Sequence, residues 1–421
     1  MARATPTLTT RCRDAQVDCV MSALRLFDDI ARTDASPALN QEGSFAFLNR
    51  VATPWWNQVR ELLEGWFADY AAGADSAKAA DIRSRFRSGD GRQHSGAWWE
   101  LYVHVLLRRT HPDVWIGVEP EREGHATRPD FCVAEGADSR PLMWVEAVTT
   151  QAGVLSVDGG SPAEAYVLDT INEVRSRDFR VAIRIHSAGV SHPRKRDITR
   201  PLSEWLDGLN RNDVLADTEA GIPRPRTTIT AGEWSIELEA LPKGAPGLEP
   251  RDRLIGFGPA KGGFLDDAGK ARTAIRGKAG HYGGLAAPLV VAVLPLGGPF
   301  DFEDAVAALY GSEAVRFDPA DPEVTAEAVR RPDGIWSMGG AEVSAVLLGN
   351  MLSPWTVAKT WPELWVNPTP TYVLMSDFDG VPRVELRGDG RLERVAAAAE
   401  TPAGLFSLPD EWPGSDPWAE S

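Results

Sequence analysis

Three carboxylates stand where an acid is costly or unusual. Glu100 interrupts the apolar run AWWELYVHVLL, and Glu146 interrupts the apolar run LMWVEAV. Asp130 follows Pro129 at the start of the run DFCVAEG. Buried acids persist mainly where a partner or a metal ion compensates for the loss of water. Converging carboxylates make a hard-oxygen site suited to Mg²⁺ or Mn²⁺, which can activate water and neutralise the charge of a phosphodiester.

The periodicity of the apolar residues predicts the elements that position these acids. Residues 97–109 have the length and composition of a buried helix. Three runs rich in β-branched and aromatic residues follow, at 114–121, 130–136 and 142–150. A helical pattern in AEAYVLDTINEVRSR and a strand in RVAIRIHSA complete the order α-β-β-β-α-β. Antiparallel neighbours joined by a short loop would bring Asp130 and Glu146 close together.

The motif R-P-D-F at 128–131 and the motif V-E-A at 145–147 carry a resemblance. Fifteen residues separate Asp130 from Glu146, and the pattern resembles the signature of the PD-(D/E)xK nuclease superfamily, as does the element order. In that superfamily the helix before the first strand often supplies a further acid, and Glu100 in WWELYVH matches it. The chain also resembles a group of uncharacterised bacterial proteins with an ELY-type helix, a PDF segment, an EA strand and a late VSAV segment.

The resemblance implies an α/β protein with a restriction-endonuclease-like core over residues 94–200. A helical unit over residues 1–93 would precede this core, and an α/β extension over 201–421 with a loose acidic tail would follow it. The implied activity is metal-dependent hydrolysis of DNA phosphodiester bonds, in host defence or DNA repair. Asp130 and Glu146 would hold Mg²⁺ or Mn²⁺, and Glu100 would complete the metal shell or orient the water.

The chain departs from the superfamily pattern at the motif lysine. That lysine stands two residues after the strand acid, where this chain has Val148. A cation there steadies developing negative charge, which valine cannot do. Members of the superfamily are known in which the lysine comes from elsewhere, so Lys278 in IRGKAGHYGG, or Lys195 in HPRKRD, would be the substitute. Thr150 and Gln151 are nearby polar groups that could orient water without charge.

Each candidate also has a structural interpretation. Glu100 could pair with an arginine or with His104 one turn away, and Asp130 could cap a turn. Lys278 has Arg272, Arg276 and His281 nearby, so a phosphate-contacting patch and a solvated helix face are both open. Other residues are expected to be structural: the isolated histidines His104, His125 and His186, the Trp98–Trp99 pair in the core, and an inert Cys132.

Composition limits the other classes of function. The formal net charge of −16 argues against nonspecific coating of nucleic acid but leaves room for a local basic groove. The three cysteines are too few for a disulfide framework, and their spacing does not resemble that of a zinc site. No apolar run is long enough to span a bilayer. We therefore expect a cytoplasmic protein with DNA as its partner, no membrane contact, and an assembly that could be a homodimer.

Other catalytic motifs are missing from the sequence. It contains no GxxxxGK[ST] phosphate loop, no GxSxG elbow and no HExxH helix. The main rival to a nuclease is a degenerate nuclease fold that acts as a binding or regulatory module, and a weaker rival is an interaction or scaffold protein in which the acids are structural. Val148 and the acidic net charge favour this rival.

Overall fold

The computed structural model describes residues 24–122, 124–125, 127–150, 161–247, 253–257, 266–282, 284–296, 300–316, 327–337, 342–374, 378 and 380–415. The chain divides into two compact units. The larger unit comprises Met1–Arg32, Pro54–Gln151 and Asp266–Gly414, and the smaller comprises Thr33–Thr53, Ala152–Leu265 and Ser415–Ser421. No helix in the described ranges combines the length and apolar character needed to cross a bilayer.

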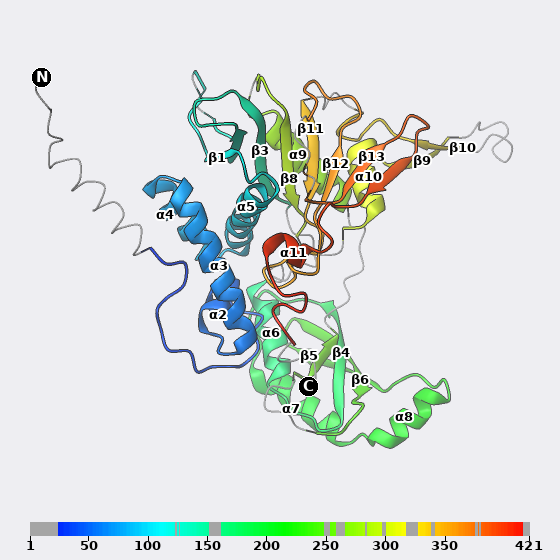
Figure 1. The fold of residues 1–421 in the computed structure, drawn as a ribbon. Helices are drawn as coiled ribbons and strands as arrows, with labels where there is room; N and C mark the ends of the chain where they lie inside the picture. The colour runs from blue at the N-terminus through cyan, green and yellow to red at the C-terminus, as the bar shows by residue number, and fades with distance from the viewer. Residues whose placement is uncertain are drawn as a thin grey trace, which may run out of the picture. The chain divides into compact units, whose positions relative to one another are not determined.

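The larger unit is built on one mixed sheet (Figure 1). Its strands, in spatial order, are β1 (Trp115–Val118), β2 (Phe131–Ala134), β3 (Pro141–Thr149), β8 (Leu289–Leu294), β11 (Val343–Leu348), β12 (Glu363–Val366), β13 (Arg383–Leu386) and β14 (Leu392–Val395). β1, β2 and β3 form an antiparallel meander, and β8 and β11 then pair parallel to β3 and to each other. β11–β12 and β13–β14 are antiparallel, and β12–β13 is parallel.

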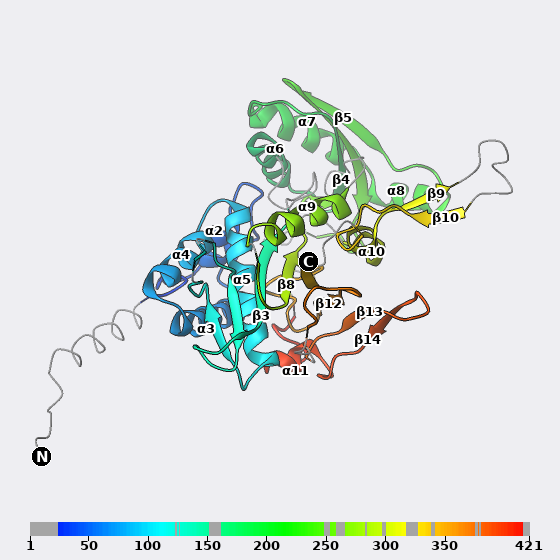
Figure 2. The ribbon, with the colours of Figure 1, turned by 90° about the horizontal axis from the view of Figure 1, so that it is seen from above.

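Helices cover both faces of this sheet. On one face the ring of Phe131 in β2 lies 5.9 Å from the ring of His104 in α5 (Gly91–Thr110). Side chains alternate between the faces of a strand, and the neighbouring Cys132 packs in a cluster with Ile275 of α9 (Asp267–Ala279) and Leu309 of α10 (Phe302–Tyr310). Figure 2 shows α9 beside β3 and β8. The centres of β3 and β8 are therefore buried on both faces of the sheet. This burial agrees with the almost wholly apolar sequences of the two strands.

Three further helices pack around α5. These are α3 (Pro54–Gly73), α4 (Ser76–Phe86) and the short α11 (Pro402–Phe406). Trp98 and Trp99 are 3% and 0% exposed, and the Trp99 indole N–H donates to the Ala292 carbonyl of β8 over 2.9 Å. The expectation that this tryptophan pair belongs to the core is confirmed. A two-stranded ribbon, β9 (Glu313–Arg316) with β10 (Glu327–Arg330), completes the unit.

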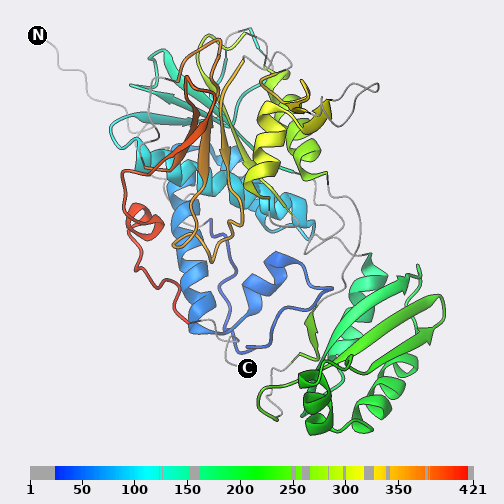
Figure 3. The same ribbon diagram turned by 90° about the vertical axis from the view of Figure 1, so that its right-hand side faces the viewer.

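The smaller unit has a four-stranded sheet of its own (Figure 3). Its order is β5 (Arg226–Ala231), β6 (Trp234–Pro242), β4 (Phe179–Ser187) and β7 (Ile255–Phe257). The helices of the unit are α2 (Ser44–Arg50), α6 (Pro162–Asn172), α7 (Lys195–Asp207) and α8 (Arg211–Glu219). Apolar residues at alternate positions of β4 and β6 pack with α6 and α7 in one core.

The observed division differs from the predicted boundaries at 93 and 200. The predicted helix and strand at 162–187 are present as α6 and β4, but they belong to the smaller unit. The order α-β-β-β-α-β in the larger unit is instead completed by α9 and β8. The predicted N-terminal unit is divided too, because α2 lies in the smaller unit while α3 and α4 pack with α5.

Two details of the predicted C-terminal extension also differ. The β-branched and aromatic residues of TYVLM at 371–375 favour a strand, but its described residues form none, and β12 lies just before it. Pro368 and Pro370 precede that segment and lack the N–H groups that a ladder needs. The tail from Pro409 is partly packed, since Trp412 is 5% exposed.

Candidate functional site

Acidic residues form one row across the first strands of the larger sheet. Phe131 pairs with Val145 in the antiparallel ladder of β2 and β3, which places Asp130 opposite Glu146 on the same face. The register of β1 and β2 places Glu119, just past the end of β1, on the other side of Asp130. The Glu119 amide donates to the Asp130 carbonyl over 2.8 Å. The predicted proximity of Asp130 and Glu146 is therefore confirmed.

Backbone amides hold the two central carboxylates. The Ala147 N–H donates to Asp130 Oδ2 over 2.7 Å, and the Asp130 N–H donates to Glu146 Oε2 over 3.2 Å. Each acid thus accepts a hydrogen bond from the strand that carries the other. Because Glu146 is only 1% exposed, its carboxylate is fixed in the interior of the sheet.

Lys278 reaches this pair of acids from the last turn of α9. Its ammonium group donates to Glu146 Oε1, and its side chain remains 37% exposed. The end of a helix is a favourable place for a cation, because the backbone carbonyls there carry partial negative charge. The candidate substitute for the motif lysine therefore does contact the strand acid.

Glu100 has an arginine as its direct partner. Arg85 of α4 binds both of its oxygens, Nη1 to Oε1 over 2.5 Å and Nη2 to Oε2 over 2.7 Å. Within the described ranges no group of three or more His, Cys, Asp or Glu side chains is arranged to hold a metal ion. Glu100 thus has the arginine partner that was its structural alternative, and it also lies near enough to Asp130 and Glu146 for their charges to act on one another.

The electrostatics of the site reflect its burial and crowding. Burial, followed by the charges of Glu100 and Glu146, raises the pKa of Asp130 well above its usual range. Burial lowers the pKa of Lys278, but the charge of Glu146 and its hydrogen bond outweigh this effect, so the pKa is raised. Burial likewise raises the pKa of Glu100 in spite of Arg85. The charges of Asp130, Glu100 and Glu146 thus act on one another as well as on Lys278.

Two further residues, Tyr282 and Glu119, lie near the acids and were not candidates from the sequence. The Tyr282 hydroxyl hydrogen-bonds the Glu146 carboxylate, and burial and that charge raise the pKa of Tyr282. Glu119 has a positive φ of 39°, an unusual conformation for a side-chain-bearing residue, and its charge adds to the rise in the pKa of Glu100. Tyr282 follows Lys278 by one turn in sequence, so spacing could have identified it. Nothing in the sequence signals the backbone of Glu119.

The other lysine candidate, Lys195, is in α7 of the smaller unit and pairs with Glu173. Two arginines near Lys278 in sequence each bind a backbone carbonyl: Arg272 donates to the Ala307 carbonyl over 2.9 Å, and Arg276 donates to the Asp333 carbonyl over 2.9 Å. Val148 packs in the apolar cluster between sheet and α9.

Other residues considered from sequence have structural surroundings. The Thr150 hydroxyl accepts from the Leu296 N–H over 3.0 Å, and Gln151 lies outside the described residues. His104 is fully buried, and burial lowers its pKa to about 4, so the ring is neutral near pH 7. Burial raises the pKa of the Cys132 thiol to about 11, in keeping with an inert cysteine. His186 lies 3.4 Å from Glu237 on the smaller sheet.

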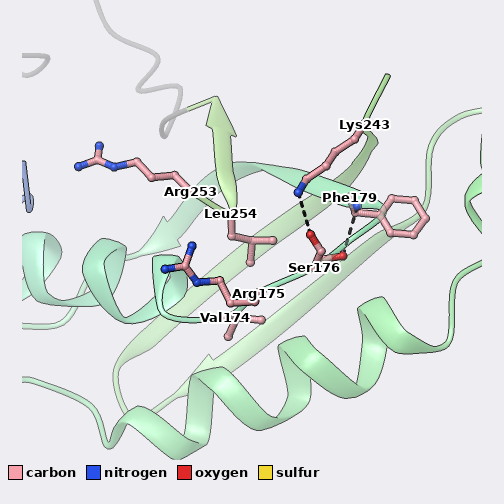
Figure 4. A pocket seen from close by; sticks show the side chains of 7 residues that line it. All are labelled: Val174, Arg175, Ser176, Phe179, Lys243, Arg253 and Leu254. Carbon is pink, nitrogen blue, oxygen red and sulfur yellow. Dashed lines mark hydrogen bonds between the residues drawn. The ribbon is translucent and has the colours of Figure 1, made fainter. Parts of the chain in front are cut away.

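A hollow in the smaller unit is a weaker candidate (Figure 4). Two arginines, Arg175 and Arg253, line it together with Lys243. The Lys243 ammonium donates to the Ser176 carbonyl over 2.8 Å and to the Gly247 carbonyl over 3.1 Å. The hollow has no room for a water-sized molecule, and Lys243 binds the backbone carbonyls of the loop beside it.

Comparison with protein-family models, curated proteins and solved structures found no significant match to this chain.

Proposed function

We propose that this chain is a metal-dependent nuclease-like protein that hydrolyses DNA phosphodiester bonds. The observation that carries the proposal is the convergence of Asp130, Glu146 and Lys278 on one face of the sheet. The order α5-β1-β2-β3-α9-β8 supports it, since it matches the element order of the restriction-endonuclease-like core that the motifs resemble. The smaller unit would then be an insertion between the third strand and the second helix of that core.

The residues present fit Mg²⁺ or Mn²⁺. Asp130 and Glu146 would hold the ion, because Mg²⁺ in nuclease-type sites commonly takes one or two protein carboxylates and completes its shell with water and substrate phosphate. The observation that supports such a fit is the pairing of the two acids across β2 and β3, where each carboxylate is bound by the strand that carries the other. When bound, the ion supplies a water of lowered pKa and neutralises charge on the phosphate.

The chain's own residues have separable roles in this proposal. The Ala147 N–H fixes Asp130 Oδ2, and the Tyr282 hydroxyl and Lys278 fix Glu146. Lys278 would hold its proton and steady the negative charge that develops on the phosphate. Glu100, bound by Arg85, would act by positioning α4 and α5 beside the acids.

Cleavage and metal binding test the proposal together. We expect purified protein to cleave DNA only with Mg²⁺ or Mn²⁺, and Asp130→Asn or Glu146→Gln to abolish cleavage and weaken Mn²⁺ binding measured by calorimetry. Glu135→Gln, on the exposed end of the same hairpin, is the matched control and should cleave normally. An active Glu146→Gln protein would refute the nuclease proposal.

One alternative has its own supporting observation. The Lys278–Glu146 ion pair already neutralises one of the two acids, and Val148 leaves the strand without a cation. Both features suit a degenerate nuclease fold that binds a partner without cleaving it. Wild-type protein that binds DNA but neither Mn²⁺ nor Mg²⁺ would favour this alternative.

A further inference from the structure

A hollow of about 360 Å³ opens in the larger unit beside the acid row. It is lined from β1, β2 and β3, from the loop that follows β1, and from the segment between α9 and β8. Cys132 and Trp144 belong to its lining, and each stands two residues along its strand from an acid of the row, Asp130 or Glu146. Side chains two apart point to the same face, about 7 Å apart along the strand.

Aromatic rings form the wall and floor of this hollow. Gly117 pairs with Cys132, and Cys132 pairs with Trp144, so these three residues form a second row parallel to the acids. A Cβ added at Gly117 would lie 2.1 Å from the Trp115 ring, so the indole is folded over the glycine and reaches this row. Trp115 is half-buried and Trp144 is nearly buried. An indole wall beside an acid site offers a surface on which a planar group can stack.

Basic and polar groups complete the lining. The Arg122 guanidinium lies 5.7 Å from the centre of the Trp144 ring, and it donates to the Tyr282 carbonyl over 3.0 Å. Tyr282 in turn hydrogen-bonds Glu146, so this residue connects Arg122 in the lining of the hollow to the acid site. Arg140 adds an exposed cation at the edge. The lining thus combines two indole rings with two arginines and one acid, Glu121. Aromatic surface together with arginine is a combination used to bind single-stranded nucleic acid.

We propose that this hollow takes one unpaired nucleobase of the DNA strand held at the acid site, so that single-stranded or locally opened DNA is the substrate class. The inference rests on the proposed function and deepens it. The volume lies at the small end of the roughly 300–1,000 Å³ typical of small-molecule pockets, which suits one nucleoside. A base in duplex DNA is stacked and paired, so it reaches such a hollow only after leaving the helix.

Fluorescence of oligonucleotides containing 2-aminopurine tests the inference without catalysis. In EDTA and low salt, we expect wild-type protein to quench a single-stranded probe and to bind it at least 10-fold more tightly than the same sequence as a duplex. Equal affinity for the single strand and the duplex would overturn the inference. Because no metal is present, this result is independent of whether Asp130 and Glu146 bind Mn²⁺ or support cleavage.

Substitutions at Trp115 and Gly117 test whether single-stranded DNA binds in the hollow. Trp115→Ala should weaken single-strand binding about 10-fold and abolish the quenching, and Trp115→Phe should restore most of both. Gly117→Ala keeps the indole but displaces it, and it should weaken binding similarly. Trp355→Ala, at a 39% exposed tryptophan of the same unit, is the matched control. Unchanged quenching in both Trp115→Ala and Gly117→Ala would overturn the inference.

Discussion

Strands β3 and β6 both carry glutamates, but in opposite surroundings. β3 is buried through its centre, and Glu146 is 1% exposed with both oxygens engaged. β6 alternates buried and half-buried residues, and its Glu239 side chain is 23% exposed beside two arginines. The larger sheet is covered on both faces, whereas the helices of the smaller sheet pack against the apolar side of β6.

Glu146 and Glu239 differ in how far each glutamate in a strand points to a functional site. In an alternating strand the polar positions face water, so Glu239 needs no special compensation. In a strand buried on both sides, an acid must have partners that offset its lost hydration. Glu146 has backbone, lysine and tyrosine partners, all close to a second acid. A carboxylate inside a continuous apolar run is thus the stronger sequence signal.

Removing Arg85 tests how strongly burial penalises an acid in the larger unit. Arg85→Ala leaves Glu100 buried without its bidentate partner, so we expect a loss of about 3–5 kcal/mol in the free energy of unfolding. Urea denaturation at pH 7 measures this loss. Arg92→Ala, at an exposed arginine of α5, should change stability by less than about 0.5 kcal/mol. A loss below about 1 kcal/mol for Arg85→Ala would mean that Glu100 is not penalised by burial.

Removing Lys278 tests whether the partner of Glu146 contributes to chemistry. Lys278→Ala should lower the single-turnover cleavage rate by about 10²–10³, the usual loss for one transition-state donor, while Mn²⁺ affinity changes little. Lys270→Ala is the control, because Lys270 lies on the same helix and pairs with Asp267 over 2.6 Å. Turnover that is unchanged in Lys278→Ala would leave the lysine a purely structural partner.

The crowding of the acids predicts a gain in stability when one is neutralised. Asp130→Asn can still accept the Ala147 hydrogen bond, and in EDTA at pH 7 we expect it to gain about 0.5–2 kcal/mol. The folded-state pKa of Asp130 is raised, so the wild-type protein loses stability as pH rises through that pKa. The advantage of the variant should therefore disappear below about pH 4. A variant less stable than wild type at pH 7 would contradict the crowding argument.

The smallest effect is expected on the smaller sheet. Glu239→Gln removes a partly exposed acid beside Arg224 and Arg226, and such pairs contribute about 0–1 kcal/mol. Thermal unfolding in low and high salt should show a small loss that salt reduces further. A loss as large as that of Arg85→Ala would remove the distinction between the two sheets.

Local patterns predicted much of the fold. The three strands of the meander and the buried helix before them lie where the periodicity placed them. The helix and strand that complete the core were instead predicted at 162–187, because that segment has the same helix-then-strand periodicity as 267–294. The strand sequences of the two segments differ in one informative way. PLVVAVLPL is continuously apolar, as expected of a strand buried on both faces, whereas RVAIRIHSA alternates, as expected of a strand buried on one face.

The candidate site was predictable to a similar extent. The opposition of Asp130 and Glu146 followed from strand order and a short connection, and Lys278 was a candidate because Val148 occupies the position of the motif lysine. The Arg85 partner of Glu100 depends on how α4 packs on α5, and the positive φ of Glu119 is a backbone property set by its surroundings. Neither is encoded in local spacing.

The insertion of the smaller unit has a consequence for how the chain folds. Glu146 pairs with Val291 across β3 and β8, residues 145 positions apart, whereas the β5–β6 ladder pairs Thr230 with Ser235. Contacts between distant segments form slowly, and a domain that folds first shortens the loop that remains to be closed. During synthesis the acids therefore emerge well before Lys278 and β8. In a nascent chain the acids are therefore without Lys278. Lys278 can contact Glu146 only after β8 has paired with β3.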